Sequence, residues 1–187
     1  MKEQVVHDGF LQVAIIQTAL GPREVIRATD SVNLLIFNKE TRQIVLLSEP
    51  RTGMRAPDNP NGISTGSIAG RFDVDLTPEK LMVKEAEEEA GVTLAPEDIT
   101  MLNNGQPMIL SAGVLTEKAY LGIAIIDDSM IEQEERVFGA DDEGESIRRV
   151  YIDLADLEDY VCESVRVFAM IQYFLRNFNG KEIDHER

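Results

Sequence analysis

The chain has 187 residues, a length that suits one domain with a single hydrophobic core. It carries 18 Lys and Arg residues against 34 Asp and Glu residues, a net charge of −16 at pH 7. Because nucleic acids and anionic membranes repel such a charge, we expect neither as a partner. The single cysteine, Cys162, excludes an internal disulfide. No leader opens the chain and no apolar run reaches about eighteen residues, so we expect a cytoplasmic protein.

The first thirty residues predict an antiparallel β-hairpin. Residues 10–20 are rich in apolar and β-branched side chains and end at Gly21-Pro22, after which residues 24–29 return as a partner strand. An isolated hairpin is marginally stable, and this one is more apolar than a solvated edge. We therefore expect residues 1–30 to form a dimerisation subdomain of a homodimer and residues 31–187 to form the main domain.

A second, more buried hairpin is predicted from the apolar runs at residues 31–37 and 43–47, which flank a polar turn. Residues 49–64 follow with three prolines, two glycines and two arginines, too much turn chemistry for a regular element. Long loops of this kind often bind ligands, so we expect residues 49–64 to do so.

Three strands and a helix are predicted in the second half of the chain. The strands lie within residues 99–110, 119–126 and 147–152, and an acidic connection over residues 127–145 precedes the last. An amphipathic helix is predicted over residues 162–177. Its apolar stripe, which we expect to contact the core or a second subunit, consists of Val165, Phe168, Ile171, Phe174 and Leu175.

The most informative stretch runs from residue 70 to residue 92 and contains a well-bounded helix. Thr77 is a good N-cap, Pro78 suits the first helical position, and Gly91 stops the helix. The helix is therefore predicted over Pro78–Ala90. At a period of 3.6 residues, one face consists of Val83, Ala86 and Ala90.

The other face gathers Glu85, Glu88 and Glu89. Like charges three and four positions apart destabilise a helix by a few tenths of a kcal/mol per pair, and Lys84 is the nearest basic residue along the chain. Carboxylate oxygens without neutral donors suit a hard divalent ion such as Mg²⁺. The alternative is a solvated acidic face with no ligand.

The stretch resembles the Nudix box, which runs glycine, five residues, Glu, seven residues, then Arg-Glu-apolar-x-Glu-Glu-x-Gly-apolar. It departs at two positions, with Leu76 in place of the first Glu and Lys84 in place of Arg. Those two family residues commonly pair, so their joint change looks like the replacement of a supporting salt bridge. The residues that match in register are Gly70, Glu85, Ala86, Glu88, Glu89, Gly91 and Val92.

The resemblance implies the Nudix fold, which is an α+β fold with a mixed β-sheet sandwiched between helices. It also implies a divalent metal, with Mg²⁺ expected first and Mn²⁺ as the second choice. By resemblance, the backbone carbonyl of Ala69 joins Glu85 and Glu89 as metal ligands. Glu88 either shares in the ligand set or lies just outside it.

Within the Nudix group, the order of parts is similar to that of the ADP-sugar pyrophosphatases. Residues 111–117 resemble that family's Ser-Pro-Gly-x-x-x-Glu loop, with Ala112 in place of the proline. The resemblance implies that Gly113 and Glu117 contact the substrate. Arg51 falls where the family has a substrate-binding arginine after a Gln-Phe pair, although the pair itself is replaced here.

The implied reaction is hydrolysis of a nucleoside diphosphate sugar, similar to ADP-ribose, to a nucleoside monophosphate and a sugar phosphate. In the family, the base is a glutamate on the loop before the last strand, which implies Glu145, with Glu143 as second choice. Together with Glu88 they form the candidate catalytic set. Two alternatives stay open: a Nudix-fold nucleotide-binding or sensor protein with weak or no turnover, and a pyrophosphatase for GDP-mannose or another nucleoside diphosphate.

Overall fold

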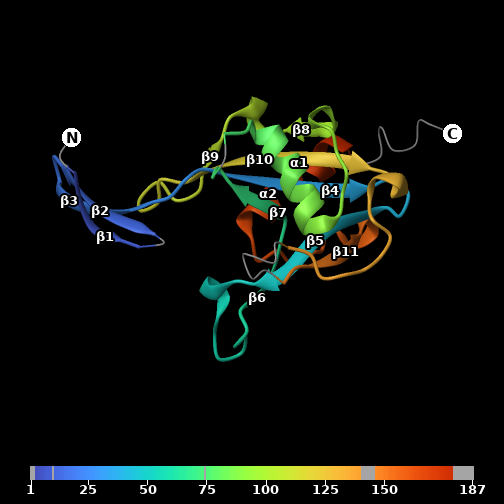
Figure 1. Cartoon of the computed structure of the whole chain (residues 1–187), viewed down its shortest axis with the longest axis horizontal. Coiled ribbons are helices and arrows are strands. Elements are labelled where there is room, and N and C mark those ends of the chain that lie inside the picture. Colours follow the sequence, from blue (N-terminus) through green and yellow to red (C-terminus); the bar gives the residue numbers. More distant parts are fainter. Residues whose placement is uncertain (1–2, 10, 74, 140–145, 179–187) are drawn as a thin grey trace.

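The computed structural model describes residues 3–9, 11–73, 75–139 and 146–178 (Figure 1). Its fold is α+β, with a mixed eight-stranded sheet, two α-helices and a separate three-stranded antiparallel sheet. In the main sheet, β11-β5-β4-β10-β8 are consecutive neighbours, while β6, β7 and β9 pair with β5, β4 and β10. The main-sheet strands are β4 (Ser31–Asn38), β5 (Gln43–Pro50), β6 (Ile63–Gly66), β7 (Ile68–Arg71), β8 (Ile99–Met101), β9 (Met108–Ile109), β10 (Lys118–Ile126) and β11 (Arg148–Asp153).

The two α-helices cover opposite faces of this sheet. Side chains alternate along β4, so that Ile36 belongs to the cluster packed under α1 (Pro78–Ala90), whereas Phe37 belongs to the cluster under α2 (Val165–Phe178). All eight residues of β4 are buried, which explains why residues 34–37 form an unbroken apolar run rather than an alternating one. The predicted sandwich of a mixed sheet between helices is confirmed.

The main sheet divides where β4 and β5 separate. Their paired register runs from Ile36–Val45 to Asn38–Gln43, and beyond it β4 pairs with β7 while β5 pairs with β6. Strands β6 and β7 therefore fill the gap, or fork, that opens between β4 and β5. Because α1 starts a few residues after β7, its acidic side chains are brought next to the fork.

The separate N-terminal sheet corrects the predicted hairpin. It has three strands, β1 (Glu3–Asp8), β2 (Gln12–Thr18) and β3 (Gly21–Arg27), and it projects from the main body (Figure 1). The turn between β2 and β3 lies at Ala19-Leu20 instead of Gly21-Pro22, because the Thr18 hydroxyl accepts from the Leu20 backbone N–H at 3.1 Å and Thr18 pairs with Gly21. All residues of β1 are exposed, so its sequence lacks the alternating apolar pattern of a half-buried strand.

The boundaries of α1 agree with the prediction. The Thr77 hydroxyl accepts from the Lys80 backbone N–H, and Gly91 ends the helix at φ 62°, in the left-handed region that favours glycine. The helix termination is therefore encoded locally, within a few residues on either side.

The apolar stripe predicted for the C-terminal helix is partly wrong. Helix α2 starts at Val165, and Val165 and Phe168 are exposed, whereas Val167 and Met170 are buried. Cys162 precedes the helix and is half-buried, rather than lying inside it as a core residue. Phe174, a member of the predicted stripe, does meet the sheet, where its ring lies 4.8 Å from that of Phe37 between centroids, with the ring planes inclined at 46°.

The remaining predicted strands are present, and within residues 99–110 the turn at Asn103–Gly105 separates β8 from β9. The loop predicted over residues 49–64 is shorter, because β5 continues to Pro50 and β6 begins at Ile63. Short 3-10 helices lie at Thr52–Met54, Pro96–Asp98, Asn103–Gly105, Asp128–Met130 and Leu154–Asp156. Neither described α-helix combines the length and apolar character that crossing a bilayer requires.

Candidate active site

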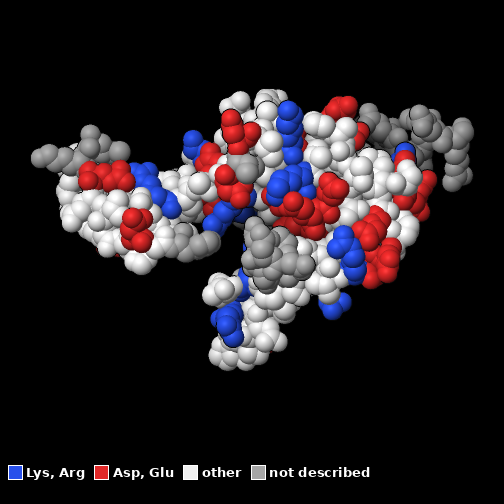
Figure 2. Space-filling model, in the orientation of Figure 1, with Lys and Arg blue, Asp and Glu red and all other residues white. Residues whose placement is uncertain are grey.

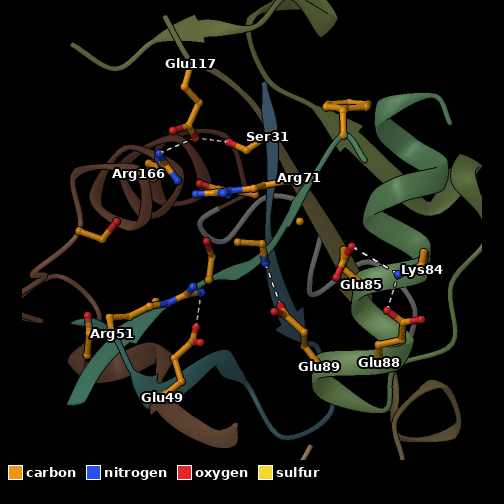
Figure 3. Close-up of a pocket in the computed structure, with 18 of the residues that line it drawn as sticks. Ser31, Glu49, Arg51, Arg71, Lys84, Glu85, Glu88, Glu89, Glu117 and Arg166 are labelled. Carbon is orange, nitrogen blue, oxygen red and sulfur yellow. Dashed lines mark hydrogen bonds and ion pairs between the residues drawn. The ribbon is translucent and has the colours of Figure 1, made fainter. Parts of the chain in front are cut away.

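A cavity of about 810 Å³ opens at the fork of the main sheet. Its walls come from β4 to β7, from α1, from the segment just before β10 and from the first turn of α2. Carboxylates of α1 line one side, and arginines from other elements line the opposite side (Figure 3). The cavity thus combines groups that can hold a cation with groups that can hold an anion.

The carboxylates of Glu85 and Glu89 reach consecutive residues of β7. Glu85 lies so close to Gly70 that a Cβ atom at this position would collide with the carboxyl group. Glu89 is 3% exposed, and its Oε2 accepts from the Ala69 backbone N–H at 2.9 Å. The alternative of a solvated acidic face therefore fails for Glu89, which is buried against the strand.

Lys84 lies beside two carboxylates of α1, those of Glu85 and Glu88. Its Nζ lies 2.5 Å from Glu88 Oε2 and 3.7 Å from Glu85 Oε1. The hydrogen bond to Glu88 raises the pKa of Lys84, so its ammonium group stays protonated at neutral pH. Over α1, acidic and basic side chains accordingly lie in contact on the surface (Figure 2).

The donor chemistry of this wall fits a divalent metal, although the ligands are not converged. Within the described part of the chain, no three His, Cys, Asp or Glu side chains gather closely enough to hold a metal ion. However, the Lys84 ammonium shows that the space between Glu85 and Glu88 accepts a cation. Lys84 is 42% exposed and flexible, so a divalent ion has only to displace a mobile side chain.

Leu76, the other departure from the Nudix box, makes an apolar contact. It is half-buried and packs against the core cluster that contains α1. An apolar contact therefore lies where the Nudix box has a Glu that commonly pairs with Arg. The loop before α1 therefore does not depend on a salt bridge at this position.

The arginine side of the cavity is built from two ion pairs. Arg51, which directly follows β5, lies 2.5 Å from Glu49, which is 7% exposed. Arg166, in the first turn of α2, lies 2.9 Å from the Glu117 carboxylate. In each pair a carboxylate fixes one edge of a guanidinium group. Such preorganised arginines suit an anionic ligand.

Several residues proposed from the sequence line this one cavity, and others do not. Lining residues include Arg51, Ala69 and Glu117, together with Glu85, Glu88 and Glu89. Gly113 is exposed and does not line the cavity. The candidate bases Glu143 and Glu145 lie outside the described residues.

The lining residues that sequence reasoning missed include Ser31, Glu49, Arg71 and Arg166. Arg71 directly follows Gly70 and ends β7, so its place beside the glycine that matches the Nudix box is the signal that could have found it. Arg166 is remote in sequence from the box, and an amphipathic pattern assigns it only to a polar helix face.

A buried arginine outside the cavity anchors the acidic connection. Arg149 on β11 donates from Nη1 to Glu132 O at 2.7 Å and to Ala90 O at 3.3 Å, and from Nη2 to Glu134 O at 3.0 Å. Its side chain is completely buried and also contacts the carboxylate of Glu135 at 2.9 Å. The end of α1 is thereby tied to the segment after β10.

Tyr151 completes this anchor, donating to Glu135 at 2.6 Å. Burial, reinforced by this hydrogen bond, raises the pKa of Tyr151 to about 12, so the phenol remains a donor at neutral pH.

Comparison with known proteins gives a distant similarity to one class of enzyme, the nucleotide-sugar pyrophosphatases. The chain is 33% identical over 108 residues to a protein named GDP-mannose pyrophosphatase from Cronobacter sakazakii (strain ATCC BAA-894), covering 57% of this chain and 53% of that protein. It is 31% identical over 107 residues, with the same coverage, to a GDP-mannose pyrophosphatase from Enterobacter sp. (strain 638). The chain thus matches about half the length of these relatives. No protein-family model matches the sequence.

Proposed function

We propose that this protein hydrolyses the diphosphate bond of a nucleoside diphosphate sugar, with a divalent metal, and that GDP-mannose is the first substrate to test. The observation that carries the proposal is the cavity in which the carboxylates of α1 face two arginines held by ion pairs. The names of the similar proteins favour GDP-mannose over the ADP-ribose expected from the sequence. The expected products are GMP and mannose 1-phosphate.

The residues on the acidic side would hold the metal. Glu85, Glu89 and the Ala69 carbonyl are the proposed ligands, with Glu88 as the residue that Lys84 now pairs. A bound Mg²⁺ supplies charge neutralisation of the diphosphate and lowers the pKa of a water molecule. Arg51 orients the substrate by donating N–H groups to phosphate oxygens. Glu145 remains the first choice for the general base, and Glu143 the second.

Product analysis tests this proposal. Purified protein is incubated with Mg²⁺ and, separately, GDP-mannose, ADP-ribose and ADP-glucose, and the nucleotides are separated by ion exchange, with EDTA as the control. We expect GMP from GDP-mannose at a higher rate than AMP from the adenine substrates. Release of AMP alone would show that the substrate is an ADP-sugar rather than GDP-mannose. If no substrate yields a monophosphate, the nucleotide-binding protein without turnover becomes the better description.

We also propose that the protein is a homodimer assembled through β1, β2 and β3. The three-stranded sheet has one fully buried residue among those described, Ala14, while Val5 and Val6 are 45% and 49% exposed. Much of its visible surface is uncharged (Figure 2). A small sheet with so little core of its own gains stability by packing against another surface.

Light scattering at micromolar concentration should give twice the chain mass of 20.9 kDa. Replacing Val5 and Val6 together by Glu should weaken association by about tenfold or more, because charges would be buried in the interface. The matched control replaces Ile109 and Val137, which are exposed on the main body, by Glu. A wild-type chain that stays monomeric, or equal effects of the two double variants, would contradict the dimer proposal.

A further inference from the structure

Helix α2 contributes its first turn to the cavity. Ser164 and Arg166 both line it, although α2 otherwise packs on the sheet face opposite α1. Ser164 caps the helix, because its backbone carbonyl accepts from the Phe168 N–H at 3.0 Å and its hydroxyl accepts from the Val167 N–H at 3.5 Å. The positive end of the α2 dipole therefore faces the cavity, next to a guanidinium group.

Arg166 is held from one side by a fixed carboxylate. Its Nη2 donates to Glu117 Oε1 at 2.9 Å, and the Ser31 hydroxyl donates to the same oxygen at 2.6 Å. Glu117 is 13% exposed and Arg166 is 29% exposed. Two donors on one oxygen fix the orientation of the carboxylate, and the carboxylate in turn fixes the guanidinium plane.

As far as the described residues show, the rest of the guanidinium group has no protein partner. Among the described residues, the hydrogen bond to Glu117 is the contact that Arg166 makes, and its remaining N–H groups donate to no other side chain or carbonyl. Arg166 and Arg51 lie on the side of the cavity opposite Glu85, Glu88 and Glu89 (Figure 3). An anion bound between the two sides would meet cationic groups on both, once a metal occupies the acidic side.

We propose that Arg166 contacts the substrate by donating to non-bridging oxygens of its diphosphate, with Glu117 and Ser31 as positioning residues. This inference rests on the proposed function, since it takes a nucleoside diphosphate as the ligand. A planar guanidinium fork matches phosphate oxygens, and the helix N-terminus beside it also favours an anion rather than a sugar hydroxyl. In a chain of net charge −16, a fixed cation at this point offsets repulsion of the diphosphate.

Binding of GDP and of GDP-mannose, measured by titration calorimetry with Ca²⁺ in place of Mg²⁺ so that GDP-mannose is not turned over during the titration, tests the inference independently of turnover. Arg166→Ala should weaken both ligands by a similar factor, about tenfold to a hundredfold, as expected for a lost charge-assisted contact. Arg166→Lys should recover part of the affinity, because it keeps the charge and loses the fork. The matched control is Arg176→Ala, which removes the same charge from an exposed site later in α2.

Glu117→Gln tests the positioning role. It should raise KM several-fold for each nucleotide sugar, leave kcat nearly unchanged and leave the thermal midpoint unchanged, which a purely structural role would not do. Loss of affinity for GDP-mannose but not for GDP would assign Arg166 to the sugar and overturn the proposal. Equal effects of Arg166→Ala and Arg176→Ala, or no effect of either, would also overturn it. If the wild type binds GDP and loses it on Arg166→Ala but releases no monophosphate, the inference holds while the proposed function fails.

Discussion

Glu89→Gln should lower the turnover of the nucleotide sugar by about a hundredfold or more while leaving the fold intact. Glu89 is 3% exposed, and its carboxylate is fixed by the Ala69 N–H, so the substitution removes a charge from a site that is already formed. The amide oxygen of Gln can still accept that hydrogen bond. The variant therefore separates loss of a metal ligand from loss of structure.

Metal binding provides a second measurement for the same variant. Mg²⁺ at a hundred times its Kd stabilises a protein by about 2.7 kcal/mol, which in a domain of this size raises the thermal midpoint by roughly 5–11 °C. Glu89→Gln should lose most of this shift. Glu87→Gln, on the exposed side of the same helix and away from the cavity, is the matched control and should keep both turnover and shift. Wild-type turnover in the Glu89 variant would place the metal elsewhere.

The acidic side of the cavity was predictable from sequence because all its parts are local. The cap at Thr77, the stop at Gly91 and the spacing of the glutamates lie within one short stretch, where helical periodicity decides which side chains share a face. Burial of Glu89 was not predictable. It depends on β7 passing close enough for Ala69 to donate to the carboxylate, which is a tertiary contact.

The arginine side was only half predictable, because its members are far apart in sequence. Arg51 was assigned through resemblance, but the partner that orients it, Glu49, was read only as a departure from the family pair. The pair of Glu117 and Arg166 joins residues 49 positions apart, and no periodicity links them. Ion pairs between such distant residues can be identified only from the folded structure, in which the sheet brings the two elements together.

Strand β1 was missed for a different physical reason. Its six residues are exposed on both faces, so neither face has to be apolar and the alternating pattern that identifies a strand is absent. Its pairing comes from backbone hydrogen bonding to β2, with a register irregularity between Val5 and His7. Backbone pairing does not require particular side chains, so the amino-acid composition of β1 does not reveal it.

Arg149 shows the same limit in the core. Along β11, Arg148 points to solvent and Arg149 points inward, as a period of two requires, but charged residues are rarely expected to be the inward ones. Its burial is explained by the carbonyl groups of Ala90, Glu132 and Glu134, all of which accept from it. The ring of Phe138, whose centroid is 4.8 Å from Cζ, covers the guanidinium group.

We expect Arg149→Met to lower the free energy of unfolding by about 3–5 kcal/mol, because it leaves buried carbonyl groups without donors. At about 2–4 °C per kcal/mol, the thermal midpoint should fall by roughly 6–20 °C. Met keeps a flexible apolar side chain of similar length, so the loss reports mainly on the hydrogen bonds and on the contact of the guanidinium group with the Phe138 ring. Arg148→Met removes the same charge from the exposed neighbouring position and should change the free energy by less than about 0.5 kcal/mol. Differential scanning calorimetry of both variants measures the two thermal midpoints. Equal midpoints would mean that the Arg149 network does not hold the end of α1 to the segment after β10.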